Sequence, residues 1–214
     1  MTALVIMVCF MTTSALGEVT AQLTKAPNVP KPLNRSGGKT VILNLEAKEF
    51  IGDIAEGKKY KFWSFGGSVP GPMARVRVGD TVQFHLSNPK SNTQPHNIDI
   101  HAVNGPGGGA AVNTVAPGES KVFSFKTLNP GLYIYHCAAG AIVDHISNGM
   151  YGLFLVEPAG GLSKVDKEFL DNAKNLKVVL RAGTGLDNID LKLLKEKKIK
   201  LISAPQANAI SAAE

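Results

Sequence analysis

Cys137 and the histidines around it impose a demanding condition on how this chain folds. All five histidines lie between positions 85 and 145, and the other cysteine, Cys9, lies in a segment that we expect to be removed. Cys137 therefore has no partner in the chain for a disulfide. A lone thiol among histidines indicates a metal site, so the fold has to bring together residues that are far apart in the sequence.

The residue types indicate which metal this is. One thiolate, two imidazoles and a thioether form a trigonal copper site with a long axial methionine, which carries single electrons. This set is supplied by His96, Cys137, His145 and Met150. The last three follow the spacing Cys-x7-His-x4-Met, typical of a loop between two strands, whereas His96 comes from far upstream. The sequence thus predicts a blue-copper centre that only the folded chain can assemble.

A second metal site is predicted beside the first. His101 follows His96 by five residues, and His136 directly precedes Cys137. Because neighbouring residues on a strand point to opposite faces, His136 can hold a second metal if Cys137 faces the first. Asp99 shares a strand face with His101, two residues away, so we expect it to reach whatever binds at the second metal. The peptide link between His136 and Cys137 then forms a short covalent connection between the metals.

Alternating apolar residues predict an all-β fold. From Lys39 the sequence follows period two, which is typical of half-buried strands. Strands are predicted at Val41 to Leu45, Tyr60 to Ser64, Val76 to Val78, Val82 to Leu86, Asn97 to Ala102, Ser120 to Lys126, Leu132 to His136 and Tyr151 to Glu157. About eight short strands separated by Gly and Pro turns predict a Greek-key sandwich or barrel. In this fold we expect His85 to be an ordinary strand residue.

Four segments are expected along the chain. Residues 1–17 contain an apolar run that ends in small residues, which is typical of an export signal; an uncleaved anchor or a misannotated start is the alternative. Residues 18–38, rich in Pro, Asn and Lys, are expected to form a flexible arm. Residues 39–160 form the predicted sandwich, and residues 161–214 a short α/β appendage. We therefore expect an exported protein, in the periplasm or on the outer face of the cell membrane.

Several short motifs follow one another between about Lys59 and Phe169. They are Phe62-Trp63-Ser64-Phe65-Gly66-Gly67, Val69-Pro70-Gly71, Pro95-His96-Asn97-Ile98-Asp99-Ile100-His101, Gly105-Pro106-Gly107-Gly108-Gly109-Ala110, Pro130-Gly131-Leu132-Tyr133-Ile134-Tyr135-His136-Cys137, and His145 to Met150 followed by Tyr151-Gly152-Leu153. In this order they resemble the first cupredoxin domain of the copper-containing nitrite reductases. The resemblance implies a cupredoxin sandwich.

The resemblance also implies a role for each candidate residue. The family's type 1 copper ligands fall on His96, Cys137, His145 and Met150, two of its three type 2 ligands on His101 and His136, and its active-site aspartate on Asp99. An electron-donor protein then reduces the type 1 copper, the electron passes through Cys137 and His136, and nitrite at the type 2 copper becomes nitric oxide. Asp99 is expected to hydrogen-bond the nitrite and to help deliver protons.

The chain departs from the family at the type 2 site. The family has two cupredoxin domains per subunit, assembles as a homotrimer and takes the third type 2 histidine from the second domain of a neighbouring subunit. No histidine follows His145 here, so this sequence does not supply that ligand. Whether the chain is an enzyme stays open, because a blue-copper electron-transfer module without catalysis would need only the type 1 copper. A multicopper oxidase acting on another substrate would need more His-x-His pairs than the chain has.

A different pattern begins after Phe169. Lys177 to Leu180 is expected to form a buried strand, Asn188 to Lys198 a helix, and Ile199 to Ile202 another strand. The stretch from Asn175 to Asp190, with Ser203-Ala204-Pro205, resembles part of the substrate domain of D-2-hydroxyacid dehydrogenases, near the phosphoglycerate dehydrogenase branch. Gly183-Thr184-Gly185 lacks the third glycine of a dinucleotide-binding motif, so no dehydrogenase activity is expected. A piece of about 45 residues rarely folds alone. This favours a fused or misassembled reading frame, or a truncated product, over a genuine fusion of two proteins.

The charge of the chain gives no sign of a nucleic-acid partner. The net charge is +6, with 13 basic and 10 acidic residues in 1–158 and 10 and 7 in the remainder. The excess is therefore spread evenly, and no basic cluster with interleaved aromatic residues is present.

Overall fold

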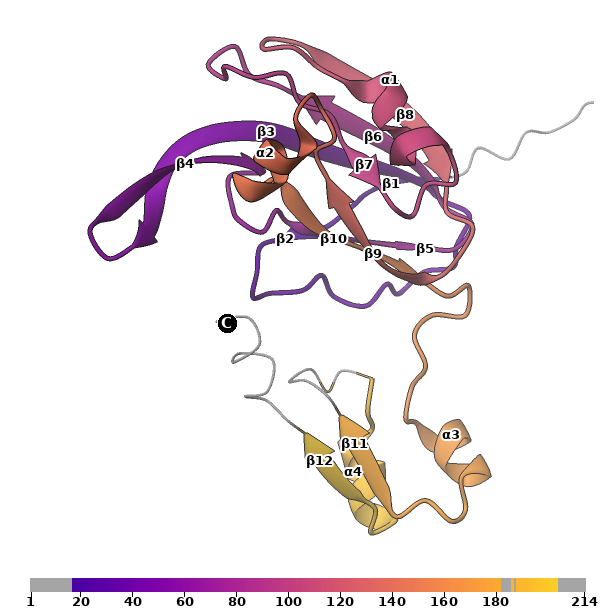
Figure 1. Ribbon diagram of the computed structural model, residues 1–214. Coiled ribbons are helices and arrows are strands. Elements are labelled where there is room, and N and C mark those ends of the chain that lie inside the picture. The colour runs from indigo at the N-terminus through magenta and orange to yellow at the C-terminus, as the bar shows by residue number, and fades with distance from the viewer. Residues whose placement is uncertain (1–16, 182–185, 187, 204–214) are drawn as a thin grey trace, which may run out of the picture. The chain divides into compact units, whose positions relative to one another are not determined.

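The computed structural model describes residues 17–181, 186 and 188–203, which form two compact units (Figure 1). Of the described residues, those up to 30 and 35–159 form one unit, and 31–34 and those from 160 onward form the other. The predicted export signal lies outside the described residues except for Gly17, and the motifs Gly183-Thr184-Gly185 and Ser203-Ala204-Pro205 lie outside them except for Ser203. None of the helices in the described part of the chain has the length and apolar character needed to cross a membrane.

The first sheet is built on one long strand, β3. It contains β1 (Glu18–Thr20), β3 (Thr40–Ala55), β4 (Lys58–Phe65), β6 (Thr81–Ser87) and β8 (Ser120–Lys126). The order is β1-β3-β6-β8, in which β3 runs parallel to β1 and β6, and β8 runs antiparallel to β6. The outer half of β3 pairs with β4 as a hairpin, which projects beyond the rest of the sandwich in Figure 1.

The second sheet brings the ends of several strands together. It contains β2 (Leu23–Thr24), β5 (Met73–Arg77), β10 (Tyr151–Glu157), β9 (Gly131–His136) and β7 (Asp99–Ile100), in this order. Antiparallel pairing places Tyr151 of β10 on one side of His136 and Asp99 of β7 on the other. The last residue of β9 is therefore flanked by the first residues of both neighbouring strands.

The core lies between the two sheets and follows the alternation of the sequence. The first sheet contributes the fully or nearly fully buried side chains of Val41, Leu43, Leu45, Val82, Phe84 and Leu86, and the second sheet those of Ala74, Val76, Tyr135, Phe154 and Val156. Each large apolar side chain that is removed from water in this way stabilises the fold by about 1.5–3 kcal/mol. The prediction of an all-β fold is confirmed.

Two connections carry short helices beside the strand ends. A 3-10 turn, η1 (Pro106–Gly109), and α1 (Ala110–Asn113) lie between β7 and β8, and α2 (Ile142–Ser147) lies between β9 and β10. Gly108 and Gly109 have φ angles of 52° and 97°, a left-handed conformation that favours glycine. The connection between Cys137 and Met150, which was predicted as a loop, thus contains a helical turn, and His145 lies on it.

The prediction of a flexible arm at residues 18–38 is wrong for its first part. Glu18–Thr20 pairs with β3, and Leu23–Thr24 pairs with β5. Strand pairing of this kind uses backbone groups, so the polar composition of the segment gave no sign of it. Further along, the guanidinium of Arg35 donates to both carboxylate oxygens of Asp80, at 2.8 and 2.7 Å.

The strand predicted at Asn97 to Ala102 is reduced to Asp99–Ile100. The side chain of Asn113 accepts a hydrogen bond from the backbone N–H of Ile98 at 2.8 Å and donates to its carbonyl at 2.9 Å. An amide side chain therefore takes the place of a strand partner at this position. This contact also fixes the segment between His96 and Asp99.

The C-terminal unit is a small α/β arrangement. It contains α3 (Lys167–Asn172), β11 (Val178–Arg181), α4 (Leu191–Glu196) and β12 (Lys200–Ser203), with β11 parallel to β12 and a small core of Leu170, Ile189 and Leu194. The sequence predicted a buried strand at Lys177 to Leu180. A strand is present there, but the prediction that it is buried is wrong, because Leu180 is 74% exposed. The helix is shorter than predicted and begins after Asp190, whose carboxylate caps it by accepting from the N–H of Leu193.

Candidate metal centres

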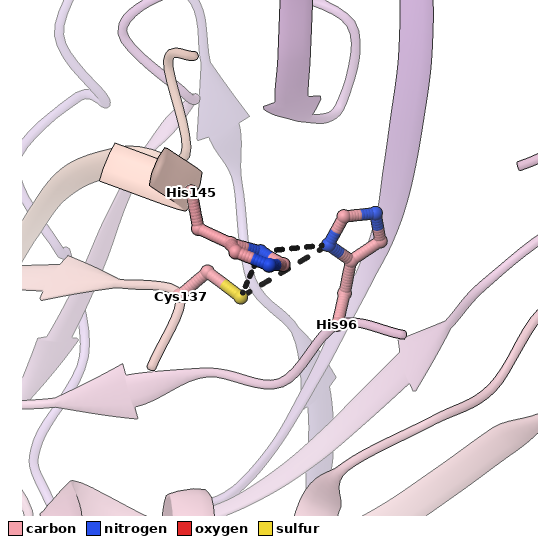
Figure 2. Close-up of side chains that lie close together, drawn as sticks. All are labelled: His96, Cys137 and His145. Carbon is pink, nitrogen blue, oxygen red and sulfur yellow. Dashed lines mark hydrogen bonds between the residues drawn. The ribbon is translucent and has the colours of Figure 1, made fainter. Parts of the chain in front are cut away.

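Three buried side chains from separate parts of the chain meet at one point. His96 forms a β-bridge with Val115, Cys137 directly follows β9, and His145 lies on α2. Figure 2 shows the two imidazoles and the sulfur turned toward one another. Sγ of Cys137 lies 3.1 Å from Nδ1 of His145 and 4.0 Å from Nδ1 of His96, and the two Nδ1 atoms are 3.3 Å apart.

These distances suit a small cation. An ion at the centre of three donors, with bonds of about 2.0–2.3 Å as for zinc, separates its ligands by about 3.5–3.8 Å. The observed separations of 3.1, 3.3 and 4.0 Å lie on both sides of this value. A hydrogen bond between two imidazole nitrogens at 3.3 Å uses the lone pair of only one of them. A metal ion between them binds the lone pairs of both. The donor set of one thiolate and two imidazoles fits copper.

Burial keeps the three donors uncharged in the metal-free protein. Burial, followed by the nearby His145, lowers the pKa of His96 to about 4. Burial likewise lowers the pKa of His145 and raises that of the Cys137 thiol. Imidazoles bind metals in the neutral form, whereas a thiol has to lose its proton. A metal that binds here therefore displaces a proton from Cys137.

Backbone contacts hold the cysteine in place. The N–H of Cys137 donates to the carbonyl of Met150 at 3.0 Å, and the Met150 side chain is fully buried. The N–H of Asn97 points at Sγ of Cys137 at 3.4 Å, and Oδ1 of Asn97 accepts from the N–H of Ala138 at 2.7 Å. A donor directed at the sulfur stabilises a thiolate, so Asn97 belongs to this site, although it was not among the predicted site residues.

A second cluster lies on the solvent side of the same strand ends. Nε2 of His101 and Nε2 of His136 are 3.1 Å apart, and Oδ1 of Asp99 lies 4.0 Å from Nε2 of His101. Two imidazoles on a tetrahedral ion are separated by about 3.3 Å, which matches this pair. The side chain of His101 is 51% exposed. The cluster can therefore hold a metal while leaving room for a further ligand from solution.

The two clusters are joined by the peptide bond between His136 and Cys137. Cys137 turns into the buried site, whereas His136 reaches the exposed His101. Nδ1 of His136 lies 3.2 Å from the carbonyl oxygen of Cys137. A carbonyl oxygen only accepts, so the proton is on Nδ1, and the lone pair of Nε2 faces the second cluster.

Gly108 lets the loop approach the second cluster closely. A Cβ at this position would lie 2.1 Å from Oδ1 of Asp99 and 2.5 Å from the backbone nitrogen of Ile100. Glycines next to His101 predict either a flexible turn or a close approach of the backbone to a site, and at Gly108 the structure has the close approach. Because Gly108 has no side chain, Asp99 can occupy its position beside the loop.

Two further side chains beside the first cluster were not predicted as site residues. Glu49, on β3, places Oε1 at 3.4 Å from Nε2 of His96. Trp63, on β4, packs its ring edge-on against His145, with 4.8 Å between ring centroids. Alternation places Glu49 on the inward side of β3 together with Val41, and an acidic residue at an inward position was a signal that could have identified it. His85 lies on β6, away from both clusters.

Two family profiles match different parts of the chain. The family described as "Multicopper oxidase" matches residues 50–160, which include both clusters. The family described as "D-isomer specific 2-hydroxyacid dehydrogenase, catalytic domain" matches residues 156–214, in agreement with the resemblance found there in the sequence.

Individual relatives agree with the first match. A copper-containing nitrite reductase from Neisseria meningitidis serogroup B is 52% identical over 154 residues, which are 72% of this chain and 40% of that protein. A copper-containing nitrite reductase from Rhizobium sullae is 39% identical over 155 residues, 70% of this chain and 41% of that protein. The solved structure of a copper nitrite reductase from Nitrosomonas europaea has 35% identity and a TM-score of 0.54, with 74% of this chain and 53% of the other covered. The chain thus spans about two fifths of the length of these curated relatives.

Proposed function

This chain belongs to the multicopper oxidase family, with copper-containing nitrite reductases among its relatives, and on that premise we propose that it serves the copper-dependent reduction of nitrite to nitric oxide. The observation that carries the proposal is the pair of clusters joined by the single peptide bond between His136 and Cys137. One cluster is buried and the other is open to solvent. Electron entry and substrate binding are thereby assigned to different sites of one domain.

The buried cluster is proposed as the type 1 copper site. His96, Cys137, His145 and Met150 would hold the ion. Bound copper supplies one-electron exchange between its cupric and cuprous states. The surrounding sandwich keeps water away from the donors, because all four are at most 5% exposed. A separate electron-donor protein is the proposed partner at this site.

The exposed cluster is proposed as the nitrite site. His101 and His136 would hold the type 2 copper, and Asp99 would hydrogen-bond nitrite or a water beside it. Reduction of nitrite to nitric oxide and water consumes one electron and two protons. A carboxylate beside a Lewis-acidic metal is suited to hand such protons to a leaving oxygen. Asp99 is 18% exposed in its side chain and can exchange protons with solvent.

The third type 2 ligand is proposed to come from polypeptide outside this sequence. His101 and His136 lie in a hollow whose apolar lining includes Ile134 and Leu153, which are 51% and 40% exposed. Such a surface suits coverage by a second cupredoxin domain of a neighbouring subunit, in the homotrimer that the family resemblance implies. Export to the periplasm or the outer face of the cell membrane is part of the same proposal.

Metal analysis combined with electron paramagnetic resonance tests the function. We expect two copper ions per chain in two distinct environments, together with nitrite turnover, when the rest of the assembly is present. Cys137→Ser should abolish the blue absorption, and His101→Ala should remove only the second copper signal. His85→Gln, a histidine away from both clusters, is the matched control and should retain both. Blue absorption that survives in Cys137→Ser would contradict the type 1 assignment.

A blue-copper electron-transfer module without catalysis is the second candidate. The observation that favours it is that, among the residues that the structure describes, two imidazoles and no third meet at the exposed cluster. One copper per chain, with blue absorption and no nitrite turnover in the full assembly, would support this candidate over the enzyme.

A further inference from the structure

Glu49 is an acidic residue at the edge of the buried cluster whose position the proposed function leaves unexplained. Its side chain is only 4% exposed, although it lies on the projecting β3–β4 hairpin. Figure 2 shows His96 with one ring nitrogen turned toward Cys137 and His145 and the other turned away from them. This other nitrogen, Nε2, is buried and makes no hydrogen bond within the described residues. Oε1 of Glu49 lies 3.4 Å from it.

The protonation of His96 follows from the direction of its ring. Nδ1 faces the sulfur and the second imidazole, so it needs a free lone pair to bind a metal. A neutral imidazole then carries its one proton on Nε2. A buried N–H without a partner is unfavourable, because it has lost its hydrogen bond to water. If the separation between Nε2 and Oε1 of Glu49 shortens by a few tenths of an ångström, the N–H makes an ordinary hydrogen bond to the carboxylate.

Glu49 is itself held firmly by its neighbours. Its carboxylate accepts from the N–H of Thr93 at 2.7 Å, from the N–H of Gln94 at 2.8 Å and from the Thr93 hydroxyl at 2.7 Å. Nζ of Lys61 lies 3.1 Å away on the solvent side. These three hydrogen bonds and the ammonium group of Lys61 stabilise the ionised form of the carboxylate. The carboxylate is therefore an anion with a fixed position, and it is anchored to the segment that leads into His96.

We propose that Glu49 is a positioning residue for the buried metal site, one that orients His96 through Nε2 and favours the cupric over the cuprous ion. The inference rests on the proposed type 1 copper role of this site. A histidine ligand that donates its other N–H to a carboxylate is fixed in its tautomer and becomes a stronger donor. The negative charge beside the ligand also stabilises the ion of higher positive charge.

Glu49→Gln tests the proposal because it removes the charge while keeping the size of the side chain. Glu46→Gln is the matched control: Glu46 lies on the same strand, is 43% exposed and pairs with Lys48 at 3.2 Å. Affinities for Cu(II) and Cu(I) are measured by competition with chelators, and the potential by redox titration of the blue absorption. We expect Glu49→Gln to lower the Cu(II) affinity about 10–100-fold and the Cu(I) affinity less than about threefold. The potential then rises by about 60 mV for each tenfold difference between the losses of Cu(II) and Cu(I) affinity. Glu46→Gln should change neither affinity by more than about threefold.

The two possible failures can be told apart. A wild-type protein without blue absorption would overturn the type 1 assignment itself. A blue Glu49→Gln variant with an unchanged potential, or with equal losses of Cu(II) and Cu(I) affinity, would overturn only the role of Glu49. If Glu49→Gln does not fold, ¹⁵N NMR of the metal-free wild-type protein decides. His96 is expected to carry its proton on Nε2, and a proton on Nδ1 would overturn the proposal.

Discussion

Glu157 lies at the end of β10 and forms ion pairs with two buried arginines of the neighbouring strand β5. Its carboxylate is 2.6 Å from Nε of Arg75 and 2.5 Å from Nη2 of Arg77. The three side chains are between 1% and 9% exposed. Arg75 also donates to the carbonyl of Pro30, and Arg77 to that of Arg35. The cluster thus ties the segment before β3 to the second sheet, whose other strand ends carry both metal centres.

Glu157→Gln removes the negative charge with almost no change in volume. Arg75 and Arg77 would then face each other as buried cations without the carboxylate between them. Removal of one partner from a buried ion pair costs about 3–5 kcal/mol, because the remaining charge stays desolvated. With a urea dependence of about 2 kcal/mol per molar, the unfolding midpoint should fall by about 1.5–2.5 M.

Urea unfolding followed by the fluorescence of Trp63 measures this loss. Trp63 is the only tryptophan of the chain and packs against the core of the sandwich, so the signal reports on that unit. Glu46→Gln, which breaks the exposed pair with Lys48, serves as control and should cost at most about 1 kcal/mol. If Glu157→Gln lowers the free energy of unfolding no more than this control does, the two buried arginines do not depend on the carboxylate of Glu157.

Three further perturbations have defined outcomes. Gly108→Ala should displace Asp99 and lower the copper content of the exposed site, measured by metal analysis, while the blue absorption remains. Gly105→Ala, whose added carbon would lie 3.8 Å from its nearest contact, should change neither the copper content nor the absorption. The metal-free protein should lose up to about 3 kcal/mol of stability as the pH falls from 6.5 toward 4, because in this range His96 takes up a proton only in the unfolded chain. Urea titrations at both pH values measure the loss, and the His96→Gln variant should show a smaller one. Tyr135→Phe should cost about 1–2 kcal/mol in the same assay, since its buried hydroxyl donates to a backbone carbonyl at 2.7 Å.

The local pattern of the sequence was sufficient to locate eight of the ten strands of the sandwich, β3 to β10, although not β1, β2 or the length of β7. β8 and β10 begin and end where the alternation predicts, because a period of two is a property of each strand by itself. The same rule separated His136 from Cys137, and the structure places them in different clusters. The choice of donor residues was also readable, since thiolate and imidazole chemistry does not depend on the fold.

The sequence by itself therefore determined the fold class, the candidate ligands and their division between two sites. Only the tertiary structure decided which residues surround those ligands. Glu49 reaches His96 across 47 residues, and Asn113 replaces a strand partner for Ile98 across 15. Pairing of the segment before β3 with two sheets was likewise invisible, because backbone hydrogen bonds leave no mark in the side-chain pattern. Contacts of this kind depend on where distant segments meet, and that is set by the packing of the whole sandwich rather than by any local preference.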